Sequence, residues 1–166
     1  MQKILPFINI IKFNELTKNE VLQMFFTACS KNDLSLVEFL LTDTRIKNVD
    51  ISSDNEKGLK CACIFGSIDV LKYLLKSPNL KIHANIHSNN DQAFKGATMM
   101  GKLHVLEFLI FDMNIKKTEH IINYLSKNKN KEIENMFNER TLNSQVNFDF
   151  YNNTQLSVNT NKNKLK

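Results

Sequence analysis

Cys61 and Cys63 have a spacing that resembles half of a zinc site, because thiolates are favoured zinc ligands. Within a helix, however, residues two apart point to different sides, and the chain has no second cysteine pair to complete four ligands. The third cysteine, Cys29, also falls in a segment with helical spacing. The sequence therefore predicts cysteines that pack in the core of a protein from a reducing compartment, without a disulfide framework.

His83 and His87 are the second pair whose spacing could do chemistry. They flank a segment in which apolar and polar residues alternate, so in an extended chain they would share one face. With Asp91 or Asn85 they could hold a metal ion, but the pattern supplies no further ligand. We therefore favour polar contacts within a connection. We expect His104 to be solvent-exposed, since it aligns with polar positions of similar segments.

The motifs of catalysis and of phosphate binding are missing from the sequence. There is no nucleophile-elbow glycine pattern, no glycine-rich phosphate loop and no pair of carboxylates in an apolar setting. With only four glycines in the chain, there is little material for such loops. We expect no enzyme active site, no cofactor and no bound metal.

One sequence pattern occurs three times at nearly constant spacing. Each copy combines a small residue, a turn residue and an apolar segment, with the small residue at Ala28, Ala62 and Ala97 and the turn residue at Asn32, Gly66 and Gly101. A period of roughly 33 residues that carries two short helices is typical of a solenoid, in which each unit buries its apolar face against its neighbours.

The apolar spacing predicts pairs of helices at 18–30 and 34–41, at 55–65 and 68–76, and at 90–100 and 103–111. Thr17 and Glu20 form the sequence pattern of a capping box at the first helix. The segments between the pairs lack a helical period and alternate loosely, which predicts extended, hairpin-like connections.

Three regions follow from these patterns. Residues 1–16 are predicted to be an N-terminal cap that packs on the first repeat, and no run approaches the roughly 18 apolar residues needed to span a membrane. Residues 17–139 are predicted to hold the repeats, divided at about 17–51, 52–86 and 87–116, with a degenerate closing repeat at 117–139. Residues 140–166 are polar and are predicted to be a largely disordered tail.

The net charge of +5 does not decide the partner of this chain. The last six residues alone contain Lys162, Lys164 and Lys166, and the other lysines are scattered among acidic residues. Binding of nucleic acid through the tail and these lysines is the alternative to binding of protein. We favour protein, because a solvated surface has the same mixture of charges.

The three copies resemble the ankyrin-repeat family over about residues 17–139. The resemblance rests on the small residues and turns given above and on the second helices, Leu34–Leu41, Ile68–Leu75 and Leu103–Ile110. The copies are most similar to a divergent variant found in intracellular bacteria, amoebae and large viruses or phages. The resemblance implies an all-α solenoid of stacked helix–turn–helix units with extended hairpin-like connections.

The copies also depart from the family. The usual Thr-Pro-Leu-His tetrapeptide is absent: its histidine position holds Phe26, Lys60 and Lys95, and its proline position holds Met24, Gly58 and Ala93. We therefore expect neighbouring repeats to be held together more by packing than by the hydrogen bonds that this tetrapeptide makes in the family.

The resemblance further implies a non-catalytic module that binds another protein on its concave side. An effector or antagonist role against a host protein, in the cytoplasm or inside a host cell, follows from the same analogy. We expect a monomer that binds no membrane. Aligned with the family, the binding positions are polar and on balance acidic, which suggests a basic or polar partner: Asn19, Glu20, Thr27, Ser53, Asp54, Glu56, Cys61, Ser88, Asn89, Asp91 and Gly96. The same residue types also favour helix caps, and Asp54 and Asn89 are good candidates for that role.

Overall fold

A computed structural model describes residues 16–43, 46 and 49–162, with side chains up to residue 146. Most of the predicted N-terminal cap and the last four residues therefore lie outside the described residues. The chain divides into two compact units, Met1–Leu106 and Glu107–Lys166.

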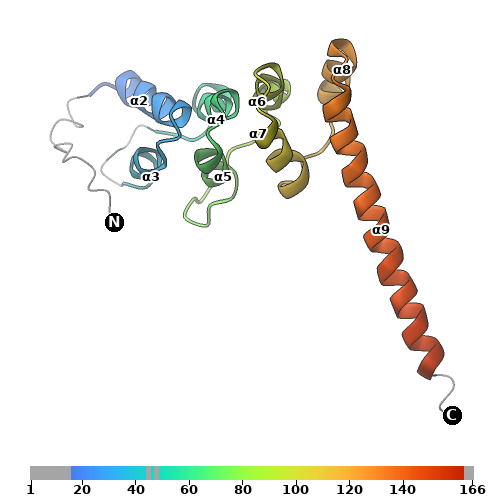
Figure 1. Cartoon of the computed structure of the whole chain (residues 1–166). Coiled ribbons are helices and arrows are strands. Elements are labelled where there is room, and N and C mark those ends of the chain that lie inside the picture. The colour runs from blue at the N-terminus through green and yellow to red at the C-terminus, as the bar shows by residue number, and fades with distance from the viewer. Residues whose placement is uncertain (1–15, 44–45, 47–48, 163–166) are drawn as a thin grey trace. The chain divides into compact units, whose positions relative to one another are not determined.

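The first unit consists of helix pairs. Its helices are α2 (Lys18–Ser30), α3 (Leu34–Thr42), α4 (Ser53–Phe65), α5 (Ile68–Lys76), α6 (Ser88–Met99) and the beginning of α7 (Leu103–Glu107). The first helices of successive repeats, α2, α4 and α6, pack side by side, and α3 packs on α5 (Figure 1). The described residues contain helices and no strand, which confirms the predicted all-α architecture.

Small residues allow the first helices to approach closely. Ala28, Ala62 and Ala97 are all buried, as the repeat pattern requires. A Cβ atom placed on Gly58 would lie 2.5 Å from Cε1 of Phe25 in the preceding repeat, so the absence of a side chain on α4 makes room for that ring. Packing between repeats thus depends on matched large and small residues.

Hydrogen bonds also join neighbouring repeats at the turns between helices. The Asn32 side-chain oxygen accepts from the backbone N–H groups of Asp69 and Val70, both at 3.1 Å. Ser67 donates to the Ser30 carbonyl at 3.1 Å, and the exposed His104 ring lies 3.1 Å from the Gly66 carbonyl oxygen through Nε2. Residues outside the missing tetrapeptide thus make hydrogen bonds between repeats, in addition to the packing that was expected there.

The connections between repeats are irregular. In the second one, Leu80 donates its backbone N–H to Ser77 and Ala84 donates to Leu74 at 2.9 Å, so the chain turns back onto α5. Only Ala84 of its alternating apolar residues is fully buried, while Ile82 is exposed. These alternating residues form no strand, because no other strand lies beside them among the described residues.

Two left-handed turns begin α4 and α6. Residues 54–56 have φ between 53° and 60°, and residues 89–91 have φ between 49° and 61°. Non-glycine residues visit this region at a cost, and Asn and Asp tolerate it best. The right-handed helices therefore follow from Lys57 and Gln92, four residues after Ser53 and Ser88. The N-cap residues, Ser52 and His87, make no side-chain capping bond.

The second unit contains a π-helical turn, η1 (Phe108–Asp112), and helices α8 (Glu119–Asn128) and α9 (Lys131–Lys162). Thr118 caps α8 by accepting from the Ile121 N–H at 3.2 Å. Arg140 of α9 donates to the Ile115 carbonyl at 2.6 Å and lies against the ring of the buried Phe137. The predicted boundary between the closing repeat and the tail, at residues 139 and 140, falls within α9.

Candidate protein-binding surface

Most of the predicted binding residues lie where a partner can reach them. Five are exposed (Asn19, Glu20, Thr27, Asp54 and Asn89) and three are half-buried (Ser53, Cys61 and Ser88). They lie on the first helices and on the turns that lead into them. Because α2, α4 and α6 pack side by side, these positions recur from one repeat to the next (Figure 1).

Three of the predicted binding residues are buried, so the outward orientation expected for them is wrong. Glu56 is 7% exposed and Asp91 is 1% exposed, and Gly96 is also buried. Each acidic residue is the last of a left-handed turn, which directs its side chain inward. Gly96 faces the preceding repeat, where a Cβ atom would lie 2.7 Å from Cγ1 of Ile64.

Glu56 links two repeats from its buried position. One carboxylate oxygen accepts from the backbone N–H of Asn85, in the next connection, at 3.0 Å. The other oxygen has no hydrogen-bond partner among the described atoms. Burial raises the pKa of Glu56 above its ordinary value of 4.5, while the bond from Asn85 opposes this and the charge of Asp50 adds to it.

The equivalent acidic residue, Asp91, pairs with a histidine. The His87 ring nitrogen Nδ1 lies 2.5 Å from Oδ1 of Asp91. His83 instead lies 2.9 Å from the Ser77 carbonyl through Nε2. The two histidines thus have separate partners, and no group of three metal-ligating side chains occurs in the part of the chain that is described.

Two exposed acidic residues are engaged within their own helices. The Thr17 hydroxyl and then the Thr17 backbone N–H bind the Glu20 carboxylate and lower its pKa, which completes the predicted capping box. Asp54 forms an ion pair with Lys57 at 3.1 Å. The capping role suggested for Asp54 and Asn89 is not found, since both lie inside the left-handed turns.

The sequence analysis missed an apolar and basic part of the same surface. Lys60 and Ile64 are one helical turn apart on α4, and Lys95 and Met99 have the same relationship on α6. Met99 is 70% exposed, and Phe65 beside Ile64 is 58% exposed. The equivalence of Lys60 with Lys95, 35 residues apart, could have revealed this feature.

The acidic character expected of the surface is therefore wrong for α4 and α6. Of their three acidic side chains, Glu56 and Asp91 are buried and Asp54 is paired with Lys57. Lys60 and Lys95 form no ion pair in the described part of the chain, and the Lys95 ammonium donates to the Asn90 carbonyl at 2.6 Å. The two helices present a mildly basic surface to a partner.

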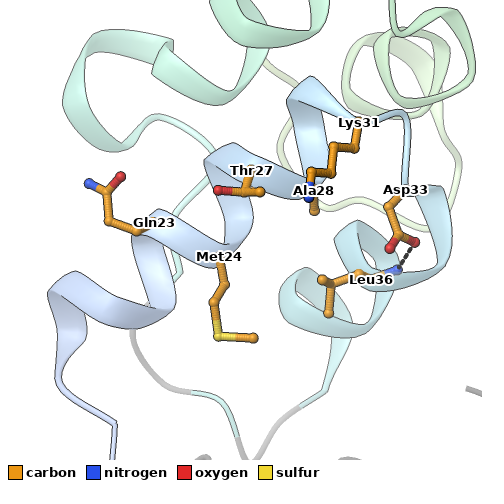
Figure 2. Close-up of a pocket in the computed structure, with 7 residues that line it drawn as sticks. All are labelled: Gln23, Met24, Thr27, Ala28, Lys31, Asp33 and Leu36. Carbon is orange, nitrogen blue, oxygen red and sulfur yellow. Dashed lines mark hydrogen bonds between the residues drawn. The ribbon is translucent and has the colours of Figure 1, made fainter. Parts of the chain in front are cut away.

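A groove opens between α2 and α3 at the first repeat. It has a volume of about 320 Å³, and Figure 2 shows Met24 and Leu36 on facing sides of it, with Thr27 and Lys31 along α2. By repeat equivalence, Met24 and Thr27 occupy the positions of Gly58 and Cys61. Because Gly58 faces the preceding repeat, these residues lie on the side of α2 that faces away from the second repeat.

A second groove lies between the first two connections. It has a volume of about 530 Å³ and is lined mainly by apolar residues of both segments, among them Leu41, Ile51, Leu80 and Ile82.

The cysteines take different positions relative to this surface. Cys29 and Cys63 are buried, and burial raises the pKa of both thiols, that of Cys63 to about 12. Only Cys61 is half-buried, at the position that corresponds to Thr27. The prediction that these residues pack in helices is confirmed for Cys29 and Cys63.

No helix in the part of the chain that the structure describes has both the length and the apolar character needed to cross a membrane. No curated protein and no solved structure matches the chain. The family model for ankyrin repeats in three copies matches residues 24–120, more than half of the sequence. This match covers the three helix pairs whose packing is described above. The chain belongs to the ankyrin-repeat family.

Proposed function

We propose that this protein binds another protein, without catalysis, through the face formed by α2, α4 and α6. Ankyrin repeats are generally protein–protein interaction modules. The observation that carries the proposal is the recurrence of accessible side chains at equivalent positions of adjacent first helices, namely Asn19 with Ser53 and Ser88, and Asp54 with Asn89. Of the other predicted binding residues, Glu20 extends the same face, whereas Thr27 lines the groove between α2 and α3 and Cys61 lies beside Cys29 of the preceding repeat.

The finer role rests on analogy with divergent ankyrin proteins. We infer an effector or antagonist that acts on a host protein in the cytoplasm or host cell interior, as a monomer. The three free cysteines, two of which are buried, agree with a reducing compartment.

Affinity capture with matched variants tests the proposal. Asn19→Arg and Ser88→Arg add bulk and charge at equivalent accessible positions of the face, whereas Lys81→Glu changes an exposed position of the second connection. Loss of the same captured protein with both face variants, but not with Lys81→Glu, supports the proposal. Equal recovery with all variants contradicts it. Glu56 and Asp91 are unsuitable for this purpose, because substitutions at buried positions would disturb folding.

If the protein binds nucleic acid instead, the affinity should depend differently on salt concentration. Binding that depends on phosphate contacts weakens steeply with salt. A steep linear fall of log affinity with log salt, together with loss of the captured protein after nuclease treatment, would favour that alternative.

A further inference from the structure

We propose that the α4–α6 part of the surface binds an acidic segment of the partner protein that also presents a large apolar side chain. The inference deepens the function proposed above and rests on it. Its basis is the basic–apolar strip, defined here as Lys60, Ile64, Lys95 and Met99. The strip crosses two adjacent repeats of the first unit.

The packing of α4 against α6 makes the strip continuous. Gly96 has no side chain, so Ile64 of α4 packs directly onto α6. Lys60 lies one turn before Ile64, and Lys95 lies one turn before Met99, so each lysine shares a face with an apolar residue. The two lysines are equivalent in neighbouring repeats and are thus separated by about the 8–10 Å between packed helices.

The apolar part of the strip is unusually open to solvent. Met99 is 70% exposed, although methionine normally packs in cores or at binding surfaces. Phe65, the last residue of α4, and the equivalent Met100, which directly follows α6, are also exposed. Aromatic and methionine side chains are enriched at protein interfaces, so this composition favours a protein ligand.

Charge complementarity specifies the partner further. The only acidic side chain of α4 and α6 that reaches solvent, Asp54, is already paired with Lys57. Carboxylates of a partner would therefore meet Lys60 and Lys95 without a competing acidic residue on these helices. An extended segment advances about 3.3 Å per residue, so two acidic residues three apart would span the two lysines, with an apolar residue between them.

The strip favours a peptide over nucleic acid. Two lysines and no arginine give few phosphate contacts, and apolar side chains contribute nothing to binding a phosphate backbone. Single-stranded nucleic acid would instead need aromatic platforms for several bases, and Phe65 is the only exposed aromatic residue of α4 and α6.

Selection of random linear peptides on the full-length protein tests the inference. The expected result is enrichment of peptides that contain Asp or Glu around a large apolar residue. The best peptide, labelled with a fluorophore, is then titrated against wild type, Lys60→Glu/Lys95→Glu, Met99→Asp and the control Lys81→Glu, after circular dichroism has confirmed that each variant is folded. We expect affinity to fall at least about tenfold in the first two variants and less than about twofold in the control.

Three outcomes would overturn the inference: the selection enriches basic or uncharged peptides, it enriches none, or the strip variants bind the peptide as tightly as the wild type does. Displacement of the peptide by a random-sequence single-stranded oligonucleotide at similar concentration would identify nucleic acid as the ligand. If the selected peptides depend on Asn19 or Ser88 but not on the strip, the inference fails while the proposed function stands. If they depend on neither, both fail.

Discussion

Asn32 of the first repeat caps α5 of the second repeat by binding Asp69 in its first turn. Its side-chain nitrogen donates to the Asp69 carboxylate at 2.8 Å, while its oxygen accepts from the Asp69 and Val70 N–H groups at 3.1 Å. The N-cap residue of that helix, Ser67, makes no side-chain capping bond of its own. A residue of one repeat thus accepts hydrogen bonds from the backbone N–H groups at the start of a helix in the next repeat.

Asn32→Ala should therefore destabilise the protein more than Asn32→Gly. Asn32 has φ 56°, so alanine adds left-handed backbone strain to the loss of the cap, whereas glycine loses only the cap. We expect the free energy of unfolding to fall by about 2 kcal/mol for alanine and about 1 kcal/mol for glycine. Urea denaturation measures both values. Equal effects near zero would show that the cap between repeats does not contribute to stability.

Gly58→Ala should destabilise the stack through a clash between repeats. The new Cβ would lie 2.5 Å from the buried Phe25 ring, which has no room to move. We expect a loss of about 1–3 kcal/mol from overpacking. Gly96→Ala is the comparison, since its Cβ would lie 2.7 Å from Cγ1 of Ile64, which is half-buried and has more room than Phe25, and we expect a smaller loss than for Gly58→Ala.

A second substitution tests whether the Gly58 effect comes from that ring. In the Phe25→Leu background, Gly58→Ala should cost less than in the wild type, because the contact is removed. Strict additivity of the two substitutions would contradict the proposed packing.

Glu56→Gln should change how stability depends on pH. Since the folded-state pKa of Glu56 is raised above 4.5, the fold favours the protonated carboxyl. Its contribution is complete below about pH 4.5 and is lost as the pH rises through the raised pKa. Glutamine is neutral throughout and retains an oxygen for the Asn85 N–H. The stability of wild type relative to the variant should therefore fall as the pH rises from 4 to 7. A constant difference, or one that grows with pH, in urea denaturation would contradict this reading.

One of the three thiols should react in the folded protein. Cys61 is half-buried, whereas Cys29 and Cys63 are buried and have raised pKa values. Mass spectrometry after brief treatment with a maleimide should find the label on Cys61 alone, and on all three residues in urea. Rapid labelling of Cys63 under native conditions would show that the second repeat is not packed as described.

Deletion of residues 1–13 tests the predicted N-terminal cap, which lies outside the described residues. This segment directly precedes α2 and contains seven large apolar residues, and Met24 and Leu36 line an open groove at this end of the stack. We expect its removal to lower the midpoint of thermal unfolding. An unchanged midpoint would contradict a capping role.

The sequence was sufficient for features with local or periodic causes. The alanines at 28, 62 and 97 revealed the helix pairs, and the Thr17–Glu20 pattern revealed a cap that the structure confirms. The left-handed turns at 54–56 and 89–91 could not be told from helix caps, because Asp and Asn favour both conformations. The burial of Glu56 depends on Asn85, 29 residues away, and no local pattern encodes that contact.

The basic–apolar strip escaped the sequence analysis for a related reason. Lys60 and Met99 belong to different repeats, and they meet on one surface only when α4 and α6 are stacked in register. Alignment with the family directed attention to polar positions, and two of the acidic residues among them proved to be buried.

Hydroxyl-radical footprinting of the captured partner complex tests the central claim of binding through the first helices most directly. In the free protein, the exposed side chains of Phe65, Met99 and Leu142 should all be oxidised. If the partner binds on the face formed by α2, α4 and α6, oxidation of Phe65 and Met99 should fall severalfold in the complex while that of Leu142 on α9 stays unchanged. Unaltered oxidation of Phe65 and Met99 in a saturated complex would contradict the account.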